Sequence, residues 1–149
     1  MKSGVLFSIF VVLLASPAQA ASRVLYAEGQ VWEYHTRPSD EGSLLRIQKI
    51  EQSAQPANFG PIYHISIIGI HFASAPLSGQ LQHAPVFASS LNASVTRLSK
   101  LQPVFPDPSE GIIQWRAANG GVFTIPIAEI VNLIEQTVPA SAPAIISSQ

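Results

Sequence analysis

The segment IYHISIIGIHF, residues 62–72, constrains the fold of this chain more than any other stretch. Side chains alternate between the two faces of a β-strand. One face would carry Ile62, His64, Ser66, Ile68 and Ile70, and the other Tyr63, Ile65, Ile67, Gly69 and His71. Both sets are largely apolar, which is typical of a strand in the interior of a sheet. The sequence therefore predicts a sheet in which this segment has a neighbour on each side.

A β-hairpin is predicted just before this strand. Residues 30–36 and 43–53 are rich in β-branched and aromatic side chains. Between them lies RPSDEG, whose Pro, Ser, Asp and Gly favour a turn. In the second strand, Ile50 does not share the parity of Leu45 and Ile47, so we expect a bulge or a late change of partner there.

The chain after the interior strand is predicted to be loop and then helix. Residues 73–85, ASAPLSGQLQHAP, are interpreted as a loop. A helix would begin at Ser89, whose hydroxyl can accept a hydrogen bond from a free amide of the first turn, and would end before Pro103. Its core-facing residues follow the i, i+4, i+7 spacing: Leu91, Val95 and Leu98.

Two further helices are predicted nearer the C-terminus. Asp107, Pro108 and Glu110 form the pattern of a capped helix start, which the following NGG would end. VFTI would be a brief strand, and Pro126 can open the last helix. The apolar stripe of that helix is Ile127, Ile130, Val131 and Ile134. Together these elements predict an α+β fold: a small antiparallel sheet of three to four strands with two to three helices packed on one face.

The N-terminus has the order of a secretory signal peptide. After Lys2, the apolar stretch from Val5 to Ala15 is shorter than the ~20 residues needed to cross a bilayer. SPAQA then offers an A-x-A site for cleavage after Ala20. The sequence thus predicts a soluble periplasmic or secreted bacterial protein, without a stable membrane anchor after cleavage. We expect a signal peptide at 1–20, an N-terminal extension at 21–28, a single α+β domain at 29–137 and a disordered tail at 138–149.

Composition excludes several classes of chemistry and partner. The chain has no cysteine, so no disulfide, thiol chemistry or Cys-ligated zinc is possible and stability must come from packing. Without Lys2, seven basic residues stand against nine acidic ones, a net charge of −2 with no run of like charge. Nucleic acid and anionic membrane surfaces are therefore not expected partners, and no cofactor is predicted.

Three segments resemble parts of a known family. EGQVWEYHTRP, HAPVFASSLNASVTRL and GIIQWRAANGGVFTIPIAEIVNLIE are similar to corresponding segments of small uncharacterised exported bacterial proteins. In that family a G-x-V-W-x-Y-x-T-R-P strand comes early, and W-R-x-A followed by G-V-F-T-I comes late. The resemblance covers roughly residues 28–135. It implies the limits of the domain and no activity, and Pro126 departs from its pattern.

Histidines are the only side chains expected to titrate near neutral pH. They are His35, His64, His71 and His83. His64 and His71 are an odd number of residues apart on one strand, so they would face opposite sides and could not share a metal. We predict no metal site. No G-x-S-x-G elbow, phosphate loop or dinucleotide-binding glycine pattern occurs, so no catalytic residues are predicted.

Trp32 and Trp115 can be interpreted in two ways. Each lies in an element with an apolar face, and aromatic side chains dominate core packing. Trp32 and Tyr34 would then share the core face of their strand. The alternative is that the tryptophans are platforms for a sugar or a peptide. We favour the core for both.

The turn of the hairpin is the predicted binding site. Arg37, Asp40 and Glu41 would put both charge signs on an exposed turn, and loops on a rigid scaffold often carry recognition. The sequence therefore favours an exported, non-enzymatic binding or accessory protein of the bacterial envelope, one that recognises or inhibits another protein.

Two alternatives to this function remain. A small periplasmic hydrolase would combine His64, Ser66 or His35 with a distant carboxylate such as Glu33 or Glu110. A purely structural envelope protein is the third possibility.

Overall fold

The computed structural model describes residues 25–54, 59–73 and 79–137. The predicted signal peptide and C-terminal tail lie outside these residues. In chain order the elements are β1 (Val31–Tyr34), the 3-10 helix η1 (Pro38–Asp40), β2 (Leu44–Glu51), β3 (Ile62–Ile68), β4 (Gln80–Phe87), α1 (Ala88–Ser94), β5 (Val95–Leu98), α2 (Ser109–Ala117) and α3 (Ile127–Thr137).

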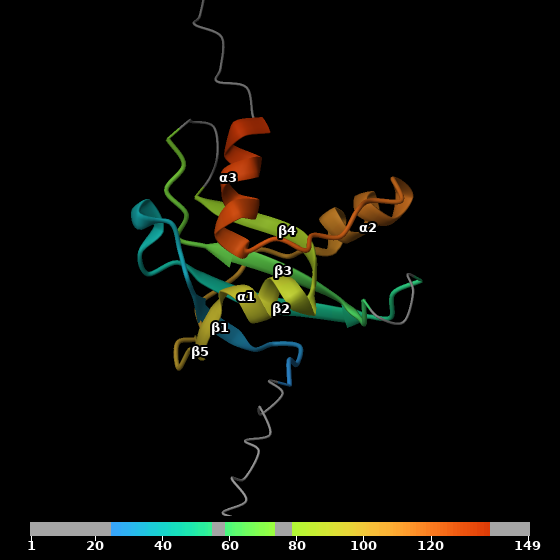
Figure 1. The fold of residues 1–149 in the computed structure, drawn as a ribbon, viewed down its shortest axis with the longest axis horizontal. Coiled ribbons are helices and arrows are strands. Elements are labelled where there is room, and N and C mark those ends of the chain that lie inside the picture. Colours follow the sequence, from blue (N-terminus) through green and yellow to red (C-terminus); the bar gives the residue numbers. More distant parts are fainter. Residues whose placement is uncertain (1–24, 55–58, 74–78, 138–149) are drawn as a thin grey trace, which may run out of the picture.

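The strands form one antiparallel sheet of five strands, in the order β4-β3-β2-β1-β5 (Figure 1). β3 lies between β2 and β4, as predicted for a segment that is apolar on both faces. β1 and β2 form the predicted hairpin, with Trp32 opposite Leu45. The register of β2 against β3 shifts between Ile47 and Lys49, which confirms the expected bulge. The fold is α+β as predicted, with one strand more than expected.

The loop predicted at residues 73–85 is partly wrong, because β4 occupies its C-terminal part. The polar residues and Pro85 of this segment are not typical of a strand, so the sequence pattern does not indicate β4. A proline has no backbone N–H to donate to a neighbouring strand. β4 is an edge strand of the sheet, with a neighbouring strand on one side only, so the missing donor is tolerated. Residues 122–125, predicted as a brief strand, make only the isolated bridge Val86↔Phe123 within the described residues.

The helix predicted from Ser89 is shorter than expected. α1 already ends at Ser94, and the chain then enters β5, so Val95 and Leu98 are strand residues. β5 pairs with the free edge of β1, and the amide that follows it, Ser99 N, donates to Val31 O at 2.8 Å. The hydrogen bonds offered by a distant strand edge therefore override the helical spacing of this segment.

The hydrophobic core lies on the face of the sheet that α1 and α3 cover (Figure 1). The predicted stripe of α3 faces this core: its first three members are buried, and Ile134 is half-buried against the cluster. The core comprises Trp32, Tyr34, Leu45, Ile47, Tyr63, Ile65, Ile67, Ile70, Ala84, Val86, Leu91, Ile127, Ile130 and Val131. None of the described helices is long and apolar enough to cross a membrane.

α2 lies on the opposite face, so the expectation that all helices pack on one face is wrong. His64 and His83 alternate along β3 and β4 with core residues and therefore point away from the core. The Trp115 ring of α2 contacts the His64 ring. The predicted helix start is one residue too early, because α2 begins at Ser109 with Pro108 as its N-cap residue. Asp107, the predicted cap, still accepts a hydrogen bond from Ser109 N through Oδ1 at 2.9 Å.

Candidate functional site

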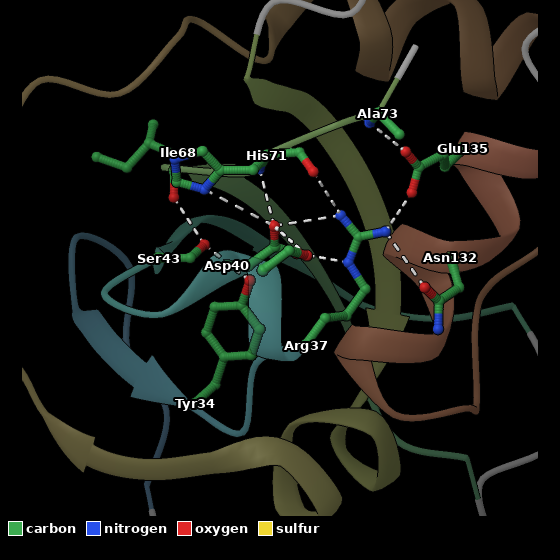
Figure 2. A network of polar contacts seen from close by, with 10 residues as sticks. Tyr34, Arg37, Asp40, Ser43, Ile68, His71, Ala73, Asn132 and Glu135 are labelled. Carbon is green, nitrogen blue, oxygen red and sulfur yellow. Dashed lines mark hydrogen bonds and ion pairs between the residues drawn. The ribbon is translucent and has the colours of Figure 1, made fainter.

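Two of the three residues predicted at the hairpin turn, Arg37 and Asp40, belong to a polar network (Figure 2). Arg37 Nε donates to Asp40 Oδ2 at 2.6 Å, and the Arg37 guanidinium also pairs with Glu135 of α3. It donates further to Asn132 Oδ1 at 3.2 Å and to the His71 carbonyl at 3.3 Å. Asp40 Oδ1 accepts from the His71 amide at 2.8 Å. The network thus ties the β1–β2 turn to α3 and to the chain after β3.

The expectation that Arg37 and Asp40 stand on an exposed turn is wrong. Their side chains are only 10% and 1% exposed, respectively. Burial alone would raise the pKa of Asp40, but the Arg37 guanidinium and the His71 amide outweigh burial and hold this pKa below its usual value. Glu41 is exposed, and its role in recognition stays a prediction.

Two histidines form a pair between the sheet and α2. Nδ1 of His64 lies 2.8 Å from Nε2 of His83, and the two rings are stacked with centroids 5.0 Å apart. His64 is fully buried and His83 is half-buried. Burial lowers the pKa of His64 against the opposing effect of Glu51. Burial, together with the nearby His64, lowers the pKa of His83 to about 4. Both rings are therefore neutral at pH 7.

The carboxylate of Glu51 lies between the histidine pair and α2. Its Oε2 atom accepts from the Arg116 guanidinium and lies 3.5 Å from His64 Nε2. His64 Nε2 makes no hydrogen bond within the described residues. Burial would raise the pKa of Glu51, but Arg116 outweighs it and this pKa lies below its usual value. The anionic Glu51 favours the tautomer with the proton on His64 Nε2, so that His83 Nε2–H donates to His64 Nδ1.

Trp115 covers this pair from α2. Its ring centroid is 5.1 Å from that of His64 and 6.4 Å from that of His83, both in edge-to-face geometry. The Trp115 indole N–H donates to the Gly121 carbonyl at 2.9 Å. The core prediction is confirmed for Trp32, which is 8% exposed. It is wrong for Trp115, which is half-buried and lies outside the core cluster.

An open pocket adjoins the outer side of this cluster, between the end of β2 and the end of α2. It has a volume of about 370 Å³. Its walls combine the aromatic and aliphatic surfaces of Trp115 and Ile62 with charged and amide groups. Its polar lining includes Glu51, Gln52, Arg116 and Asn119. We call this hollow the Trp115 pocket. It can hold a small ligand that offers one apolar face and several hydrogen-bonding groups.

α2 approaches the sheet closely because Gly111 has no side chain. A Cβ at this position would lie 2.6 Å from His83 Cβ, so Gly111→Ala must push α2 away from His83. We expect a net loss of about 1–2 kcal/mol of unfolding free energy, because overpacking exceeds the gain in helix propensity. Urea denaturation should show the loss. Gly121→Ala is the control, since a Cβ there meets nothing within 4 Å. Equal stability of the two variants would contradict this packing.

The sequence does not predict the pairing of His64 with His83, because His83 lies in a segment interpreted as a loop. Recognising β4 as an antiparallel neighbour of β3 would have placed the two histidines on one face. The carboxylate next to His64 is Glu51, rather than the expected Glu33 or Glu110. Those two have partners elsewhere: Arg97 for Glu33, and Gln114 for Glu110.

Comparisons with known proteins leave the site to be judged on its geometry. No protein-family model, curated protein or solved structure matches this chain. The resemblance to a family of exported bacterial proteins therefore stays a prediction. In the part of the chain that the structure describes, no three His, Asp or Glu side chains gather as a metal ion would require.

Proposed function

We propose that this protein is an exported, non-enzymatic binding protein of the bacterial envelope, and that it binds a saccharide in the Trp115 pocket. The observation that carries the proposal is a half-buried indole on the wall of a pocket that also presents a carboxylate, a guanidinium and amides. A sugar presents apolar C–H faces that pack on aromatic rings, and hydroxyls that both donate and accept hydrogen bonds. The pocket wall, with an aromatic ring beside hydrogen-bonding groups, therefore matches the surface of a sugar.

The polar groups of the pocket are already held in place before a ligand arrives. Glu51 and Arg116 pair with each other, and their side chains keep 22% and 48% of their surface exposed. Each therefore retains free hydrogen-bonding positions, Glu51 as acceptor and Arg116 as donor. Asn119 is exposed and offers an amide with both functions. Pre-positioned groups lose little freedom on binding, which favours affinity for a small ligand.

The hydrolase alternative is favoured by one observation, the row formed by Glu51, His64 and His83. A carboxylate next to an imidazole can orient a general base. However, His64 is fully buried, and the Ser66 hydroxyl donates to the Gln82 carbonyl at 2.6 Å. The row therefore lies beneath the pocket wall, and we rank hydrolysis below binding.

Titration with cellobiose, maltose and diacetylchitobiose tests the proposal. We expect at least one of them to shift the indole N–H resonance of Trp115 with a Kd below about 1 mM, equivalent to about −4 kcal/mol. The shift should saturate at pH 7.5. The sugars should be recovered uncleaved after long incubation, whereas cleavage products would favour the hydrolase.

Variants at the pocket wall provide the control. Gln52→Ala and Asn119→Gly each remove hydrogen-bonding groups at exposed positions and should weaken binding about fivefold. Ile113→Ala is the matched variant on α2, because Ile113 is 59% exposed and does not line this pocket. The proposal is wrong if none of the sugars shifts the resonance, or if the wall variants bind as well as Ile113→Ala.

A further inference from the structure

We infer that the His64–His83 pair makes this protein acid-sensitive: protonation of the pair loosens α2 from the sheet and releases the ligand from the Trp115 pocket. The release of a ligand rests on the proposed function. The loosening of α2 is a property of the protein itself and can be measured without any ligand.

The bond between the two rings limits how many protons they can hold. A hydrogen bond between His64 Nδ1 and His83 Nε2 needs one donor and one acceptor, so one of these two nitrogens must lack a proton. The pair can keep this bond with one additional proton but not with two. A second additional proton makes both facing nitrogens N–H groups at a separation of 2.8 Å, and the stacked rings must then separate.

Protonation also affects the contact that holds the end of α2. Arg116 and His64 both face the same oxygen, Glu51 Oε2. In neutral His64 the 3.5 Å approach of Nε2 is not a hydrogen bond. A cationic His64 attracts this oxygen more strongly and competes with Arg116 for it. Because Arg116 lies on α2 and lines the pocket, weakening its ion pair loosens the helix and deforms the pocket.

The remaining charged groups around the pair do not compensate for added protons. From β2, Lys49 stands opposite His64 in the sheet, and Glu51 is the anion nearest to the rings. From α2, Arg116 adds a second positive charge, while Glu110, which is bonded to Gln114, contributes to the pKa shift of neither histidine. Two cations and one anion therefore surround a pair that would itself become cationic.

The pKa shifts of the two histidines determine how the packing of α2 responds to pH. Both histidines have pKa values below the ordinary 6.5, so the loosened state binds more protons than the packed state. Stability of the packing is complete above pH 6.5 and decreases as the pH falls from 6.5 towards about 4, the pKa of His83. Glu51 has a lowered pKa and stays charged in the upper part of this window. Loosening above pH 5 therefore reports on the histidines.

Hydrogen exchange of the α2 amides between pH 7.5 and pH 5 tests the inference in the unliganded wild type. We expect their protection factors to fall about tenfold at pH 5, because the loosened state binds protons more readily. The amides of α3, on the other face of the sheet, should keep their protection. Constant protection of α2 would overturn the inference.

A variant assigns the effect to the pair. His83→Gln keeps an amide that can bond to His64 Nδ1 but does not titrate, and should reduce the tenfold effect to about threefold or less. His35→Gln replaces an exposed histidine and should retain the full effect. An acid response in His83→Gln equal to that in His35→Gln would overturn the inference. If His83→Gln does not fold, the titration of the two paired rings in wild-type NMR spectra decides: their midpoints must match the loosening of α2.

The sugar experiment separates the two claims. A sugar that binds at pH 7.5 should bind about tenfold more weakly at pH 5 in the wild type, and with little change in His83→Gln. Absence of sugar binding at pH 7.5 contradicts the proposed function, and α2 exchange alone then decides the inference. A sugar Kd that does not change with pH, while α2 loosens, contradicts ligand release.

Discussion

Replacing Arg37 by Ala is expected to lower the free energy of unfolding by about 3–5 kcal/mol, because it leaves a buried carboxylate without its cation. Asp40 is 1% exposed and depends on Arg37 for its counter-charge. The variant also loses the link to Glu135 and Asn132 of α3. Urea denaturation at pH 7 measures the loss. A change below about 1 kcal/mol would show that the ion pair is dispensable.

Two variants separate charge from packing in this network. Adding Asp40→Asn to Arg37→Ala should recover part of the loss, because a neutral amide does not need a cation. Glu41→Ala should change stability by less than about 0.5 kcal/mol, since Glu41 is exposed. A recognition role for the turn is therefore best tested with Glu41→Ala alone, because variants at Arg37 and Asp40 disturb the fold.

Trp32→Ala is expected to cost about 3–5 kcal/mol of unfolding free energy. The indole is 8% exposed in the core and packs edge-to-face on Tyr26, with ring centroids 5.7 Å apart. Its Nε1–H donates to Gln30 Oε1 at 3.1 Å. Truncation therefore leaves a cavity and removes one of the two hydrogen bonds to Gln30 Oε1, which keeps the bond from Ala27 N. Chemical denaturation followed by circular dichroism measures the loss independently of tryptophan emission.

A core variant must be compared with a surface variant. Leu101→Ala removes an apolar side chain that is 65% exposed and should cost less than about 0.5 kcal/mol. Trp32→Phe should lie between the two because it refills part of the cavity. If Trp32→Ala were as stable as Leu101→Ala, the role of Trp32 as a core residue would be wrong.

Elements with local signals could be predicted from the amino-acid order alone. The interior strand follows from apolar residues on both faces of 62–68, and the hairpin from turn residues between two β-rich runs. The parity change at Ile50 marked the bulge in β2. The stripe of α3 follows from helical spacing, because the residues that share one face lie within three turns.

Strand pairing and side-chain burial could not be predicted in this way, because they depend on contacts between distant segments. β5 is a strand because the edge of β1 is free to bond to it, and nothing within 95–98 states this. Arg37 is half-buried because Glu135, 98 residues away, is brought beside it. The His64–His83 pair depends on the register of β4 against β3. Local patterns specify elements, but burial and ion pairing arise from contacts between segments far apart in the chain, which periodicity and turn chemistry do not encode.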